Sequence, residues 1–155
     1  MKAQATLALA VFSTLTLGGC GHGDMMNNGL SSMHQAVTDG EAENDRHSSA
    51  CDAAESMPAM LSELDRHESG MSQVMDRVDG ALRGMGHCSG ANFDDLSHSV
   101  TQLHSAMSDH DQRIRSAATL DVARAECSTH VGSMAGMMQN MMGDLAGMSC
   151  MMTYP

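Results

Sequence analysis

The chain has 155 residues, enough for one domain with a hydrophobic core, and carries 19 Asp and Glu residues against 8 Lys and Arg residues. Its formal net charge of −11 excludes binding to nucleic acid or anionic lipid through charge, and it favours cations. Only 2% of the residues are aromatic, which excludes base stacking and an aromatic ligand box.

Residues 1–19 have the features of a bacterial lipoprotein signal peptide. Lys2 precedes an apolar run that is too short to span a membrane, and this run ends in LGGC, Leu17 to Cys20. The motif resembles the lipobox of bacterial lipoproteins, which implies cleavage before Cys20 and a lipid anchor on that cysteine. Gly21 then favours the outer membrane, with the folded part facing the periplasm. The alternative is an ordinary secretory leader in which Cys20 has no role.

The mature chain consists of a short tether and an internal duplication. Residues 20–28 are rich in Gly and Asn, which indicates a flexible link to the anchor, and residues 29–152 form the folded domain. A shift of 63 residues aligns two repeat halves, 28–88 and 91–151. The clearest match is the series Glu, His, Met, Met at four-residue spacing, which occurs in both halves.

Each half contains two stretches with helical periodicity, so the predicted fold class is all-α. Two duplicated αα-hairpins would pack as an antiparallel four-helix bundle. Ser56 and Thr119 are start signals for the second helix of each half. Gly40 weakens the first helix by about 1 kcal/mol relative to Ala. The predicted helices cover about 29–54, 57–86, 93–117 and 120–150.

The helical register places four histidines at one level of this bundle. In an antiparallel hairpin, residues at equal distances from the turn face each other, and the two turns are predicted near Met57 and Leu120. Four converging imidazoles cannot satisfy both ring nitrogens of each residue without water or an ion. Helix bundles build metal sites from facing helices, and histidine is the commonest metal ligand. The alternative is a hydrated histidine network. The four predicted ligands are His47, His67, His110 and His130.

Side chains in neighbouring layers are candidates for additional ligands. Glu63 and Glu126 each lie one turn before one of the four histidines, and Met71, Met107 and Met134 lie in the layer farther from the turns. Thioethers are soft ligands that suit Cu(I), so the predicted metal is copper, with Zn, Ni, Co and Fe as alternatives. The competing interpretation is that these methionines only fill the core.

Four cysteines follow Cys20, and an even number in an exported chain indicates two disulfides. Cys51 and Cys127 fall in one layer and are predicted to pair, and Cys88 and Cys150 are predicted to pair at the opposite end. The alternative keeps Cys51 and Cys127 reduced, as thiolate ligands beside the histidines. The cysteine spacing matches no zinc finger and no haem attachment motif.

Together these features predict a lipid-anchored protein that binds copper for sequestration, sensing or delivery. The composition resembles that of Met- and His-rich periplasmic copper proteins. One alternative is a dinuclear-metal redox or oxygen-binding bundle that uses Glu63 and Glu126 as extra ligands. Another is a metal-free envelope or stress lipoprotein that binds a partner protein. A binding protein is expected rather than an enzyme, because no nucleophile–base pair or nucleotide motif is present. The expected partners are a metal ion, the membrane through the anchor, and an envelope protein.

Overall fold

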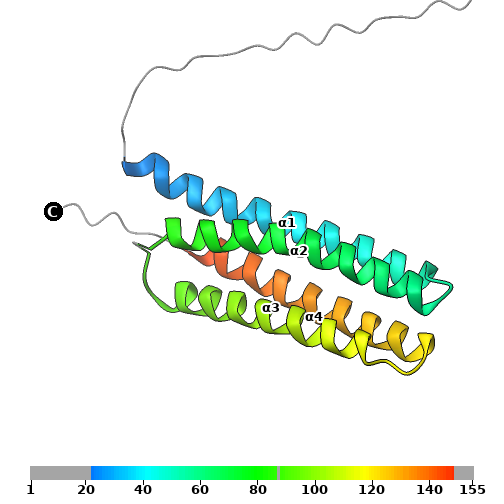
Figure 1. Cartoon of the computed structure of the whole chain (residues 1–155). Helices are drawn as coiled ribbons and strands as arrows, with labels where there is room; N and C mark the ends of the chain where they lie inside the picture. The colour runs from blue at the N-terminus through cyan, green and yellow to red at the C-terminus, as the bar shows by residue number, and fades with distance from the viewer. Residues whose placement is uncertain (1–21, 87, 149–155) are drawn as a thin grey trace, which may run out of the picture.

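The computed structural model describes residues 22–86 and 88–148, and this part of the chain folds into four helices. The helices pack side by side with alternating direction, so the predicted all-α, antiparallel four-helix bundle is confirmed (Figure 1). Their bounds are α1 (His22–Ala53), α2 (Met57–Gly84), α3 (Ala91–Arg115) and α4 (Leu120–Gly147).

Two side-chain caps fix where α2 and α4 begin. The Ser56 hydroxyl accepts a hydrogen bond from the Ala59 amide at 3.3 Å, and the Thr119 hydroxyl accepts one from the Val122 amide at 3.3 Å. Each bond satisfies an N–H group that has no acceptor within the first turn of the helix. Pro58 adds a preset backbone angle at the start of α2. Both helices therefore begin where the sequence predicts.

The start of α1 differs from the prediction. The helix begins at His22, so most of the segment 20–28, predicted as a flexible tether, is helical. Extending an existing helix gains one hydrogen bond per residue, which makes it far easier than nucleating a new one. The helix also continues through Gly40, where a Cβ atom would lie 3.0 Å from Met138 Sδ and 3.2 Å from Val74 Cγ1. Gly40 is thus a site of close packing, and it does not break the helix.

The bundle is assembled from two hairpins, α1–α2 and α3–α4. The main contact between the hairpins joins α1 to α4, and α2 contacts α3 less extensively. Consequently α1 and α3 lie on one diagonal of the bundle, and α2 and α4 lie on the other. Both hairpin turns lie at one end of the bundle, and the α2–α3 connection lies at the other (Figure 1).

A layer of buried polar residues divides the hydrophobic core into two clusters. The smaller cluster lies next to the hairpin turns and includes Cys51, Leu64, Ile114 and Cys127. The larger cluster extends toward the other end of the bundle and contains most of the buried methionines. Methionine is flexible enough to fill a core that has few aromatic side chains, and full burial of one contributes about 1.5–3 kcal/mol. The buried methionines of this cluster are Met33, Met71, Met75, Met85, Met134, Met138 and Met141.

The described helices include none that is both long enough and apolar enough to cross a bilayer. The predicted leader, residues 1–19, and the predicted lipidation site Cys20 lie outside the described residues.

Candidate metal centre

The four histidines form one buried layer, with one residue from each helix. His47 stacks on His67 with ring centroids 3.8 Å apart, and His110 stacks on His130 at the same distance. The two stacked pairs meet edge to face across the bundle, with centroid distances of 5.3 Å for His47–His110 and 5.7 Å for His67–His130. None of the four side chains is more than 6% exposed. The structure thus brings together all four histidines that the sequence selects.

Two glutamates hold the histidines of the first hairpin by crossing from one helix to the other. Glu63 Oε1 on α2 lies 2.9 Å from His47 Nδ1 on α1, and Glu43 Oε1 on α1 lies 3.2 Å from His67 Nδ1 on α2. Sequence reasoning placed Glu63 near the site but missed Glu43. The signal was present, because Glu43 precedes His47 by four residues, as Glu63 precedes His67.

Arg66 and Gly70 keep both carboxylates in place. The Arg66 guanidinium lies 2.6 Å from Glu63 Oε1 and 2.9 Å from Glu43 Oε1, and so neutralises charge that would otherwise be buried. A Cβ atom at position 70 would lie 2.9 Å from Glu43 Cδ, so only glycine leaves room for this carboxylate. Burial raises the pKa of Glu63, but hydrogen bonds from Arg66 and His47 outweigh it and hold this pKa below its usual value.

All four imidazoles are held neutral. Burial lowers the pKa of His67 to about 2, that of His130 to about 3 and that of His110 to about 4, and the neighbouring histidines add to each shift. Burial also lowers the pKa of His47, although the hydrogen bond that His47 donates to Glu63 opposes this effect. A neutral imidazole has a free lone pair, so no proton competes with a metal at neutral pH.

The Nε2 atoms of His47 and His110 approach each other within the layer. Because the Nδ1–H groups of His47 and His67 donate to the glutamates, their Nε2 atoms carry lone pairs. His47 Nε2 lies 3.2 Å from His110 Nε2, close enough for a hydrogen bond. A tetrahedral site with metal–nitrogen bonds of about 2.0 Å has nitrogens about 3.3 Å apart, which is nearly the same separation.

Two further nitrogens at this site lack partners. His67 Nε2 and His130 Nε2 are buried, and neither makes a hydrogen bond within residues 22–86 and 88–148. A buried polar atom without a partner costs about 1–3 kcal/mol. A cation bound to His67 Nε2 would recover that cost, and His130 Nε2 would contribute in the tautomer that carries its proton on Nδ1.

The second hairpin leaves an opening to the histidines where the first hairpin closes it. A pocket of about 150 Å³ reaches His110 and His130 between α3 and α4. The 63-residue repeat matches Glu43 to Ala106 and Arg66 to Thr129, so the two side chains that close the first hairpin are short here. The pocket is lined by Ala106, Asp109, His110, Arg113, Glu126, Thr129, His130 and Ser133.

Glu126 lies in this opening and bonds to none of the four histidines of the layer. Its carboxylate pairs with Arg113 at 3.4 Å, and about a third of its side chain is exposed. The two repeat-related glutamates therefore have different surroundings, since Glu63 supports His47 inside the first hairpin and Glu126 faces solvent at the second.

The predicted pairing of Cys51 with Cys127 is confirmed as a disulfide between α1 and α4. Its sulfurs adjoin the histidine layer, since His47 Nε2 lies 3.3 Å from Cys127 Sγ and 3.5 Å from Cys51 Sγ. These three residues form a buried His/Cys/Cys group that can hold a transition metal, but only while the sulfurs are reduced. Cys88 is also disulfide-bonded. Its predicted partner Cys150 lies outside the described residues, so this pairing stays a prediction.

The candidate methionine ligands belong to the larger hydrophobic cluster. Met71 and Met134 are fully buried there, and Met107 packs against the cluster while partly exposed. Asn44 lies among them and donates to the Val131 carbonyl at 3.0 Å. Their burial agrees with a core-filling role.

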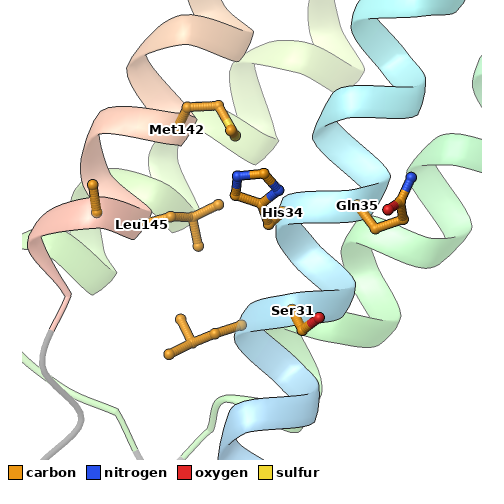
Figure 2. A pocket seen from close by; sticks show the side chains of 7 residues that line it. Ser31, His34, Gln35, Met142 and Leu145 are labelled. Carbon is orange, nitrogen blue, oxygen red and sulfur yellow. The ribbon is translucent and has the colours of Figure 1, made fainter.

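A second histidine-containing pocket lies well away from this layer. Figure 2 shows His34 and Met142 lining a pocket between α1 and α4, together with Leu145 and Gln35. His34 lies thirteen residues before His47 on the same helix, which corresponds to about 20 Å of helix length. This pocket is therefore separate from the candidate metal centre.

The sequence matches no protein-family model, and no curated protein or solved structure is similar to it, so the chemistry of the histidine layer is the guide to function.

Proposed function

We propose that the bundle binds one transition-metal ion among the four histidines of the buried layer, and that this ion is copper, held for sequestration, sensing or delivery. The observation that carries the proposal is the pair of hydrogen bonds that Glu43 and Glu63 accept from Nδ1 atoms. Metal-binding histidines commonly donate their second ring N–H to a carboxylate, which fixes the tautomer and the orientation of the ring. A buried imidazole N–H needs an acceptor in any case, and the point specific to metal binding is that both donors are Nδ1 atoms, which leaves the Nε2 lone pairs free. The ligands are His47, His67, His110 and His130.

The donor atoms suit a borderline or soft cation. Imidazole nitrogens bind Cu, Zn, Ni and Co, and raw affinity among divalent ions is highest for Cu(II). Met71 and Met134 bring thioethers into the adjoining cluster, and these favour Cu(I). Copper alone in this group has two oxidation states that match the two ligand types. Imidazole suits Cu(II), and thioether suits Cu(I).

A dinuclear centre receives less support. Such centres in helix bundles use several inward carboxylates, often as bridging ligands. Glu63 is already bound by Arg66 and His47, and Glu126 is paired with Arg113 in the opening. Neither carboxylate can bridge two ions without giving up these partners.

The opening between α3 and α4 is the proposed route by which the ion enters and leaves. On this side, Ala106 and Thr129 occupy the repeat positions of Glu43 and Arg66, whose side chains close the first hairpin. Asp109 and Glu126 place carboxylates in its lining, which attracts a cation as the net charge of the chain does. An access route on one side suits a protein that takes up an ion and releases it again.

The proposed location is the periplasmic face of a bacterial envelope, with a lipid on Cys20 and the outer membrane favoured. The support for this location is the LGGC motif at the end of the apolar leader. Incorporation of labelled palmitate by the wild-type protein and its loss in a Cys20→Ser variant would support the anchor. Equal labelling of the two proteins would contradict it.

Metal analysis of protein purified without a histidine tag tests the proposed site. We expect one copper per chain in the wild type and none in a His67→Leu/His130→Leu variant, whose leucines keep the layer buried. His98→Ala/His104→Ala is the matched control, because it removes two exposed histidines and should keep the copper. Circular dichroism establishes that all three proteins fold. The proposal fails if the wild type binds no Cu(I), Cu(II), Zn(II), Ni(II) or Co(II), or if the leucine variant keeps its metal.

A further inference from the structure

The Cys51–Cys127 disulfide lies in an unusual place for a purely structural link. Cys51 is 2% exposed and Cys127 is 1% exposed, and both sulfurs contact the same imidazole nitrogen, His47 Nε2. A link between α1 and α4 could have been placed at any level of the bundle. Here it lies directly beside a nitrogen that carries a lone pair.

The repeat shows that packing at this level does not require cysteine. The repeat counterpart of Cys51 is Ile114, and that of Cys127 is Leu64. All four side chains belong to the same hydrophobic cluster, so two aliphatic residues and two cysteines complete one layer. The two cysteines break the repeat at different positions, yet these positions meet in the folded bundle next to His47.

We infer that reduction of the Cys51–Cys127 disulfide creates a second metal site, in which two thiolates and His47 Nε2 bind a soft cation such as Cu(I). In the disulfide-bonded structure, the two sulfurs and the His47 ring nitrogen already lie within 4.8 Å of one another. Sulfurs bound to one tetrahedral ion lie about 3.8 Å apart, as follows from metal–sulfur bonds of about 2.3 Å. The Cα atoms are 6.6 Å apart on neighbouring helices, so rotation of the two side chains brings the sulfurs to that separation.

His110 supplies a candidate fourth ligand. Its Nε2 lies 3.2 Å from His47 Nε2 but outside the group of atoms within 4.8 Å of one another, so it joins the site only after moving toward the sulfurs. The reduced donor set would thus consist of two thiolates and two imidazoles. Thiolates are much softer ligands than imidazoles, so the reduced site selects Cu(I), with Zn(II) as the expected competitor.

The reaction that opens this site is a thiol–disulfide exchange with a dithiol reductant. One thiolate of the reductant attacks a cysteine sulfur, the S–S bond breaks, and a mixed disulfide forms. The second thiol of the reductant then attacks the mixed disulfide and releases the protein with both cysteines reduced. Cys51 and Cys127 have gained two electrons and two protons, and the reductant has become a disulfide. Binding of the cation displaces the two thiol protons to solvent.

This inference does not depend on the histidine layer holding a metal. The proposed function concerns four imidazoles in the oxidised protein, and the inference concerns sulfur ligands in the reduced protein. Only His47 and His110 are common to the two sites. Each hypothesis can therefore fail alone.

The test compares oxidised and reduced protein in a Cys20→Ser background, with Co(II) and Cu(I) as probes. Reduction should produce a sulfur-to-cobalt charge-transfer band in the near ultraviolet. It should also raise the affinity for Cu(I), measured by competition with a chromophoric chelator, on the order of 100-fold. A Cys51→Ser/Cys127→Ser variant should show neither change. Cys88→Ser/Cys150→Ser is the matched control, because it removes the same number of sulfurs and should keep both changes.

The outcomes separate the two hypotheses. Cobalt binding without a charge-transfer band in the reduced protein would overturn the thiolate site and leave the histidine site standing. The thiolate site would also be overturned if reduction still raised the Cu(I) affinity of the Cys51→Ser/Cys127→Ser variant. If reduction unfolds the bundle, circular dichroism after adding Cu(I) decides: recovery of helix supports the site, and a chain that stays unfolded with Cu(I) contradicts it.

Discussion

Glu43 on α1 accepts a hydrogen bond from His67 on α2, although the histidine one turn away on its own helix is His47. The reciprocal bond joins Glu63 to His47, so the two glutamates exchange partners across the hairpin. This exchange ties the register of α1 to that of α2 at the level of the histidine layer. It also leaves the Nε2 atoms of both rings with free lone pairs.

Replacing Glu43 by glutamine should weaken metal binding more than it weakens the fold. The carboxamide keeps the shape of the side chain but loses the charge that pairs with Arg66 and fixes the His67 tautomer. Loss of such a supporting carboxylate typically lowers metal affinity about 10- to 100-fold. Competition titration with a chelator measures the change. Glu55→Gln is the control, because Glu55 is exposed and carries the same charge. Equal affinities for the two variants would contradict the supporting role of Glu43.

Gly70→Ala should destabilise the bundle, although alanine is the better helix former. The new Cβ atom would lie 2.9 Å from Glu43 Cδ and would displace the buried carboxylate. The cost of such overpacking is about 1–3 kcal/mol. Gly132→Ala on α4 meets nothing within 4 Å and should instead raise the free energy of unfolding by about 0.5–1 kcal/mol. Urea denaturation followed by circular dichroism measures both. A Gly70→Ala variant as stable as Gly132→Ala would show that Glu43 does not need this space.

The level of the histidine layer was predictable because it depends on spacing alone. Apolar residues that alternate at three and four positions define a helix face, and the turns fix which positions meet in an antiparallel hairpin. His47 and His67 share a level for that reason. The same arithmetic placed Cys51 beside Cys127, which the structure confirms.

Glu43 precedes His47 by the same four residues that separate Glu63 from His67, but this spacing alone does not predict that Glu43 is buried. It lies in a polar stretch of α1, and its burial depends on Arg66 and Gly70, which belong to another helix. Periodicity describes which face of a helix is apolar, but it does not describe which charges are neutralised by a neighbouring helix. The different roles of Glu63 and Glu126 have the same origin, since their surroundings differ at Ala106 and Thr129.

The stability of the metal-free protein should fall as the pH drops below about 6.5. Burial lowers the pKa of His67 to about 2, that of His130 to about 3 and that of His110 to about 4, whereas the unfolded chain has ordinary histidines. Below pH 6.5 the unfolded state therefore binds more protons than the folded state. The free energy of unfolding has its full value above this pH and decreases as the pH falls below it. Each buried histidine should cost roughly 1.4 kcal/mol per pH unit in that window.

Urea unfolding at several pH values between 7.5 and about 5 measures this slope, in a range where carboxylates add little. The His67→Leu/His130→Leu variant lacks two of the buried groups and should lose stability less steeply. A wild-type stability that does not change over this range would contradict burial of neutral histidines.

Closing the opening between α3 and α4 should slow metal exchange without abolishing binding. Ala106→Glu with Thr129→Arg and Ser133→Gly restores the residues that Glu43, Arg66 and Gly70 provide in the first hairpin. The new pair should fill the pocket of about 150 Å³ beside His110. We expect uptake and release of copper to slow by about 10-fold or more, because the ion then waits for a local opening of the helices. The equilibrium affinity should change much less, since both rates fall together.

Stopped-flow mixing with Cu(II) and with a chelator measures the two rates. Ser105→Glu with Thr101→Arg is the matched control, because it adds the same charges to exposed positions of α3 that do not line the pocket. Its rates should equal those of the wild type. If the filled variant exchanges copper as fast as this control, the ion must reach the histidines by another side of the bundle. A loss of affinity with unchanged rates of uptake would instead mean that Ala106 and Thr129 shape the site and do not gate it.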